Sequence, residues 1–129
     1  GAVNMPQQPV ATASWNSALS VEQITADVIY VNIGSHLAAS GRFTAPIAGT
    51  YWYSFTGMSG SAGNHLSIRL YKNNTGLSND LTAYTDDETY AHATSFGYIT
   101  LAANDYLEFR NMLTTLHTSY GTINFALVA

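Results

Sequence analysis

Hydrophobic residues recur at every second position in several short segments of this chain. Leu66, Ile68 and Leu70 alternate with polar side chains, and residues 107–110 and 123–127 show the same spacing. Successive side chains of a β-strand point to opposite faces of the sheet, so this spacing predicts strands whose apolar face lines a core. Turn-forming residues separate the segments at intervals typical of an all-β sandwich or barrel. We expect strands near residues 10–15, 28–33, 41–45, 49–57, 65–72, 90–101, 105–112 and 121–128.

One segment breaks the alternation. From Tyr51 to Phe55 four of five residues are aromatic, so the strand is apolar on both faces. One face packs into the domain's own core. The face carrying Trp52 leaves a large ring in water unless a second sheet or another subunit covers it. The pattern therefore predicts an oligomer, with Tyr51, Trp52 and Tyr53 at the subunit interface.

The remaining segments predict the chain's organisation. Residues 1–9 hold two of the three prolines and show no periodicity, which indicates an extended N-terminal arm ahead of a single head domain at 10–129. Residues 16–27 fit either a short capped helical turn or an irregular connection, and we favour the connection. Polar stretches at 57–64, 73–89 and 113–120 predict loops.

Composition excludes two classes of function. The formal net charge is −4 with only four Lys and Arg residues, so no basic stripe is available to neutralise the phosphates of nucleic acid. No window approaches the roughly 18 consecutive apolar residues of a membrane helix, so we expect no membrane insertion. The chain has no cysteine, and only 9% of its residues are charged. This neutral exterior favours an extracellular location or a virion surface.

The aromatic segment also carries a family pattern. Gly41, Phe43, Pro46, Gly49, Tyr51, Tyr53 and Phe55 form the run Gly-x-Phe-x-x-Pro-x-x-Gly-x-Tyr-x-aromatic-x-Phe. This run resembles the signature of the complement 1q globular head family, which belongs with the tumour-necrosis-factor-like jelly rolls. The segments 30–37, 68–74, 101–107 and 123–127 are similar to further family positions, so the resemblance covers roughly residues 9–129.

The resemblance implies a ten-stranded antiparallel jelly-roll sandwich that assembles as a homotrimer. Asn74 and Asn104 stand where the family has glycines at turns, and asparagine tolerates the left-handed backbone conformation better than most residues do. The spacing from Leu37 to Phe43 is shorter than in the family pattern. These departures suggest a distant branch, which we expect to be a phage or bacterial one.

No pattern for catalysis or a required cofactor is present, so we expect no enzyme. The chain lacks a nucleophile elbow, and no pair among its eight acidic residues is singled out for glycoside hydrolysis. The four histidines lie too far apart in sequence to form a metal motif. The acidic run at 86–88, with Asp80 nearby, is the best place for Ca²⁺, and some relatives bind calcium near the trimer top. Three acids in a loop are more often simply solvated.

Recognition of a ligand by loop residues is the class of function that these exclusions leave. Amphipathic rings beside loops are frequent where proteins bind partners or stack on sugars. The candidate ligand-binding residues are Tyr84, Asp86, Asp87, Tyr90, His92 and Tyr120. An alternative is that such rings only pack in the core or between subunits.

The sequence thus predicts a non-enzymatic trimeric head that recognises a surface glycan, protein or host receptor, at the tip of a phage or bacterial fibre. Two alternatives stay open. One is a purely structural trimerisation module of a virion or spore coat. The other is a secreted recognition head of innate immunity, which a collagen-like stalk would precede.

Overall fold

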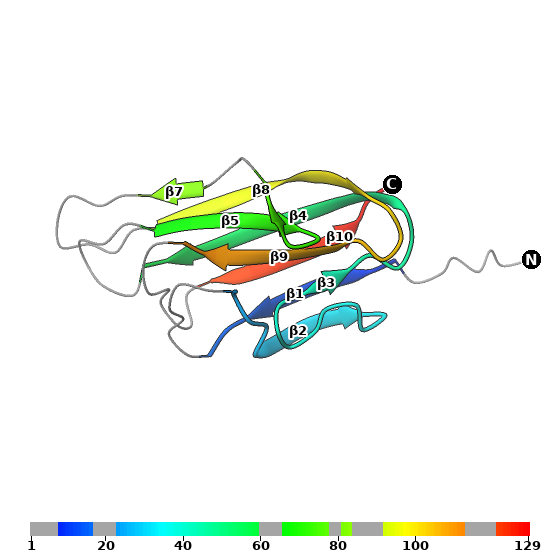
Figure 1. The fold of residues 1–129 in the computed structure, drawn as a ribbon. Coiled ribbons are helices and arrows are strands. Elements are labelled where there is room, and N and C mark those ends of the chain that lie inside the picture. Colours follow the sequence, from blue (N-terminus) through cyan, green and yellow to red (C-terminus); the bar gives the residue numbers. More distant parts are fainter. Residues whose placement is uncertain (1–7, 17–22, 60–65, 78–80, 84–91, 113–120) are drawn as a thin grey trace, which may run out of the picture.

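The chain folds into two antiparallel β-sheets packed face to face (Figure 1). The computed structural model describes residues 8–16, 23–59, 66–77, 81–83, 92–112 and 121–129. The predicted all-β jelly-roll sandwich is confirmed. Among the described residues no helix has the length and apolar character needed to cross a lipid bilayer.

The first sheet has the strand order β2-β1-β10-β4-β8. The second sheet has the order β3-β9-β5-β6, and β7 also pairs with β5. The strands of the first sheet are β1 (Val10–Ser14), β2 (Val28–Ile33), β4 (Gly49–Met58), β8 (His92–Leu101) and β10 (Thr122–Leu127). Those of the second sheet are β3 (Phe43–Thr44), β5 (Leu66–Lys72), β6 (Thr75–Gly76), β7 (Leu81–Ala83) and β9 (Tyr106–Asn111).

The alternation in the sequence found eight of these strands. The structure adds β6 and β7, which fall inside the segment 73–89 that we expected to be a loop. They were missed because each is only two or three residues long, too short to show a period. Of the segment 16–27, residues 23–27 are irregular apart from one isolated bridge from Gln23 to Arg110, and residues 17–22 lie outside the described residues.

The core lies between the sheets and is rich in stacked rings. Phe43 on β3 stacks on Phe125 of β10 with a centroid distance of 4.9 Å. Phe109 on β9 lies 5.8 Å from Phe55 of β4, and Trp15 stacks on that same Phe55 at 5.9 Å. The expected core residues of β5, β9 and β10 are buried, with Leu127 partly so. The alternating apolar positions therefore face one another across the sandwich.

Two glycines of the family-like run have a steric role. Gly41 has φ +93°, and a Cβ there would overlap the carbonyl oxygen of Ile24. Gly49 lies against the chain end, where a Cβ would sit 2.7 Å from the Ala129 oxygen. Asn74 (φ 66°) and Asn104 (φ 73°) adopt the left-handed conformation expected of them. The turns therefore form with asparagine in place of glycine.

Candidate functional site

The outer face of the first sheet is aromatic and free of charge. Its five strands contain no Lys, Arg, Asp or Glu. Trp52 of β4 pairs with Tyr98 of β8, and Ser54 pairs with Phe96, so these side chains share one face. Phe96 is 70% exposed and Tyr98 is 67% exposed. Val31 and Ile33 of β2 pair with Thr12 and Val10 and are exposed as well.

The polar groups in the middle of this face bond to one another. Thr12 of β1 donates to Asn124 Oδ1 of β10 at 2.7 Å, and Asn124 Nδ2 donates to Ser54 Oγ of β4 at 2.9 Å. One asparagine therefore links three neighbouring strands. Because these groups have partners within the protomer, another surface can cover them without leaving unpaired polar atoms.

The aromatic run of β4 divides between the two faces. Tyr51 is 0% exposed, lies edge-on to Phe43 and donates its hydroxyl to the Ile47 carbonyl at 2.7 Å. Burial raises the pKa of its phenol. Tyr53 points the same way and packs partly against Phe109. The structure corrects the prediction that Tyr51 lies at a subunit interface, because its own protomer already covers the ring. Trp52 lies on the opposite face and is partly exposed, and its place at a subunit interface stays a prediction.

The second sheet carries all four cationic residues of the chain. Arg42 directly precedes β3, Arg69 and Lys72 lie on β5, and Arg110 lies on β9. Arg69 pairs with Arg110 across the two strands. The alternate positions of β9, Leu107 and Phe109, are buried, so Arg110 belongs to the outer face.

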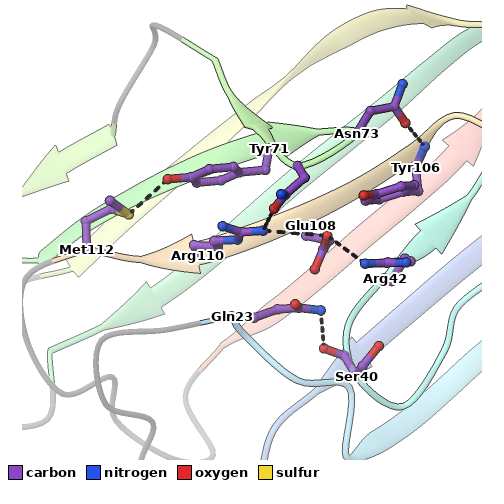
Figure 2. Close-up of polar contacts among 10 residues, drawn as sticks. Gln23, Ser40, Arg42, Tyr71, Asn73, Tyr106, Glu108, Arg110 and Met112 are labelled. Atoms are coloured by element: carbon purple, nitrogen blue, oxygen red, sulfur yellow. Dashed lines mark hydrogen bonds and ion pairs between the residues drawn. The ribbon is translucent and has the colours of Figure 1, made fainter.

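At the centre of this outer face a buried carboxylate lies between two guanidinium groups (Figure 2). Glu108 is 0% exposed, and its Oε1 lies 3.4 Å from Arg42 Nη2 and 3.8 Å from Arg110 Nη2. Its Oε2 has no hydrogen-bond partner among the residues that the structure describes. Arg42 stacks over the Tyr106 ring and Arg110 over the Tyr71 ring, each 3.9 Å from the ring centroid. We call these five residues the arginine–tyrosine cluster.

Polar side chains surround the cluster. Arg110 Nη2 also donates to Asn74 Oδ1 at 2.7 Å, and Gln23 Nε2 donates to the Ser40 carbonyl at 2.6 Å (Figure 2). Ser40, Asn73, Asn74 and Thr75 are exposed. The rim of the cluster is therefore built from amide and hydroxyl groups.

The turn between β8 and β9 is held by a second polar network. Asn73 Nδ2 donates to Asp105 Oδ1 at 2.8 Å, and Asn73 Oδ1 accepts from Tyr106 N at 2.9 Å. The bonds from Asn73 and from the Ala102 amide, with Lys72 nearby, hold the pKa of Asp105 below its ordinary 3.8. Asn73 begins an Asn-Asn-Thr sequon, but its amide is used at both ends, so a glycan there would break this network.

Sequence reasoning missed the arginine–tyrosine cluster. Alternation alone places Tyr106, Glu108 and Arg110 on one face of β9, which was a usable signal. Arg42 gave no such signal, because it lies 66 residues from Glu108 and reaches it only through the pairing of β3 with β9.

Most of the predicted loop site lies outside the described residues, namely Tyr84, Asp86, Asp87, Tyr90 and Tyr120, together with the suggested calcium loop. His92 is described: it begins β8, pairs with Met58 and is exposed. Within the described part of the chain, no three His, Asp or Glu residues gather as a metal site would require.

Comparison with known proteins adds a family and a fold. The family model described as the C1q domain matches residues 10–122. Comparison with curated protein sequences finds no match.

Several solved structures are similar over 95% of this chain. The globular domain of zebrafish complement 1qA protein has a TM-score of 0.79 at 14% identity, over 98% of that chain. Eiger TNF from S. frugiperda has a TM-score of 0.73 at 16% identity, over 93% of that chain. Murine APRIL has a TM-score of 0.73 at 14% identity, over 100% of that chain. At these identities the likeness establishes the fold.

Proposed function

The chain belongs to the C1q domain family, and from this premise we propose that it is a trimeric head that binds a ligand on another surface. C1q domains are non-enzymatic modules for binding and trimerisation, are typically extracellular, and typically form homotrimers. The single observation that carries the proposal is the charge-free aromatic face of the first sheet. It presents Phe96 and Tyr98 at 70% and 67% exposure in the isolated protomer.

The occupant of this face is a second copy of the chain. Large exposed apolar patches mark interaction surfaces, and burying an aromatic ring between subunits stabilises an assembly. The absence of charge matters equally, since burying an unpaired charge at an interface is costly. The Thr12, Asn124 and Ser54 network leaves the polar centre of the face satisfied before assembly.

Light scattering of the purified chain tests the trimer. We expect a stable trimer at micromolar concentration, and Phe96→Asp should convert it to a folded monomer because it buries a charge at the interface. Ile47→Asp is the matched control, since Ile47 is also exposed (52%) but lies in the connection between β3 and β4, outside the five strands of this sheet. A wild-type monomer at these concentrations would refute the proposal.

We also propose that the head belongs to a phage or bacterial surface fibre. The low charge and the lack of cysteine support a phage or bacterial surface protein, with residues 1–9 as an arm leading into the head at 10–129. Three equivalent sites on one trimer add avidity to weak single contacts. Trp52 then serves assembly, and the ligand contacts lie elsewhere.

A purely structural trimerisation module is the second candidate, because the aromatic face alone accounts for assembly. Adsorption of the labelled trimer to host cells, with a glycan array beside it, distinguishes the two. A binding head adsorbs, and Tyr84→Ala or Tyr90→Ala tests the predicted loop site while light scattering confirms that the trimer persists. A trimer that adsorbs to nothing is a scaffold.

A further inference from the structure

We propose that the arginine–tyrosine cluster on the second sheet binds the acid group of an acidic carbohydrate. The inference rests on the proposed binding function and names a ligand class for it. It places the contact on the outer face of β5 and β9, away from the loops that the sequence singled out.

The charge distribution is the first reason. The chain has a net charge of −4, yet all four of its cations lie on or beside the second sheet. Among the described residues of the second sheet and its turns, the acidic ones are Glu108 and Asp105. The described part of this face therefore carries a net positive charge on a negative protein. Such a local field attracts anions, whereas the first sheet offers no charge at all.

The internal pairing of the cluster is the second reason. Both guanidinium groups lie 3.4–3.8 Å from the same Glu108 oxygen, beyond the roughly 2.7–2.9 Å of a charge-assisted hydrogen bond. Within the described part of the chain, Glu108 Oε2 and Arg110 Nε are buried without a hydrogen-bond partner. A buried charge group of this kind is weak evidence for stability, and unsatisfied buried atoms call for another explanation. Holding the guanidinium groups ready for a ligand is such an explanation.

The geometry of the arginines is the third reason. Each guanidinium plane is supported by a tyrosine ring at 3.9 Å, which restrains its orientation. The Arg42 side chain remains 46% exposed, and Glu108 is its one hydrogen-bond partner among the described residues. A planar, oriented guanidinium with free N–H groups suits two-point binding of a carboxylate or sulfate.

The polar side chains around the cluster favour a carbohydrate as the carrier of the acid group. The exposed groups around the cluster include the side chains of Ser40, Asn74 and Thr75. Amides and hydroxyls both donate and accept, so they match the hydroxyl groups of a sugar ring. We therefore favour an acid group on a sugar over one on an acidic peptide.

The test uses the wild-type trimer on an array of oligosaccharides that carry uronic acid, sialic acid or sulfate. Each stands beside its carboxyl-reduced or desulfated counterpart, and poly-glutamate is included as a peptide polyanion. We expect binding only to the oligosaccharides that carry the acid group. If binding is lost on carboxyl reduction, the ligand group is a carboxylate; if it is lost on desulfation, the ligand group is a sulfate.

Arg42→Lys is the decisive variant. It keeps the positive charge that compensates Glu108 and so preserves the fold, but it removes the planar fork. We expect about a tenfold weaker affinity, the size of one lost hydrogen bond to a charged group. Lys72→Arg is the matched control, because Lys72 lies on the same sheet but pairs with Asp105 at 3.8 Å, outside the cluster. We expect its affinity to stay unchanged.

The outcomes separate this inference from the proposed function. Equal binding to neutral sugars or to poly-glutamate overturns the carbohydrate acid site. If the Arg42→Lys variant adsorbs to cells as well as the wild type does, the acid site is overturned but the proposal of a binding head is not. A trimer that binds no sugar, no poly-glutamate and no cell overturns both.

Discussion

At the scale of single residues, Gly41 shows why the family-like run needs glycine. Its φ of +93° is unfavourable for any side chain, and a Cβ would collide with the Ile24 carbonyl. That segment cannot retreat easily, because the Ile24 amide donates to the Phe109 carbonyl at 2.9 Å. The glycine therefore lets the 23–26 connection run beside β9, where Gln23 pairs with Arg110.

Gly41→Ala should lower the free energy of unfolding by at least about 3 kcal/mol, since backbone strain and a backbone collision add together. Urea denaturation followed by tryptophan fluorescence measures the change. Ala39→Gly in the same turn is the control and should cost less than about 1 kcal/mol. Equal stability of both variants would contradict the steric role of Gly41.

Asp105 gives a second prediction at this scale, for acid pH. Its pKa is lower in the folded protein than the ordinary 3.8, chiefly because Asn73 donates a hydrogen bond to the carboxylate. The carboxylate therefore adds stability that is fully present above about pH 4 and is lost as the pH falls through the folded pKa. Asp105→Asn should flatten the dependence of the melting temperature on pH between about 2 and 4. An unchanged slope would argue against this linkage.

At the scale of elements, β9 combines an ordinary core face with an unusual outer face. Leu107 and Phe109 are buried between the sheets, while Glu108 is equally buried on the other side. The Glu108 carboxylate lies between two guanidinium groups, and the connection that contains Gln23 pairs with β9 next to it (Figure 2). The strand is therefore covered on both faces.

This cover predicts an asymmetry between two mutations. Arg42→Ala leaves the fully buried Glu108 carboxylate with one distant partner, whereas Glu108→Gln leaves Arg42 free to turn its 46% exposed side chain towards water. Arg42→Ala should therefore cost more stability, by about 1–2 kcal/mol, because an uncompensated buried charge is the more expensive state. Chemical denaturation of both variants and of the double mutant measures the difference and the coupling. The reverse order would contradict the arrangement.

At the scale of the whole molecule, the two sheets have opposite outer surfaces. The first sheet is aromatic and uncharged, which suits contact with other copies of the chain. The second sheet carries the cations and a polar rim, which suits a hydrated ligand. One sandwich thus offers separate surfaces for assembly and for recognition.

If assembly buries the aromatic face, stability must depend on protein concentration. Binding that favours the folded state raises the melting temperature by mass action, so dilution from about 10 μM to about 0.1 μM should lower it by several degrees. Trp52→Ala should weaken this dependence. Differential scanning fluorimetry across the dilution series measures both effects, and a constant melting temperature in the wild type would oppose the trimer.

The sequence by itself determined eight of the ten strands, the buried set and the aromatic segment at 51–55. These follow from local spacing, since the two-residue period of a strand assigns each side chain to a face. The prediction of Asn74 and Asn104 as left-handed turn residues holds for the same local reason.

Only the tertiary structure decided which neighbours those faces meet. Tyr51 and Trp52 look alike in sequence, yet Phe43 covers one of them within the protomer and leaves the other on the outer face. Arg42 meets Glu108 because β3 pairs with β9 across 66 residues of chain. Strand order in a sandwich depends on pairings between distant segments, and local periodicity carries no information about them.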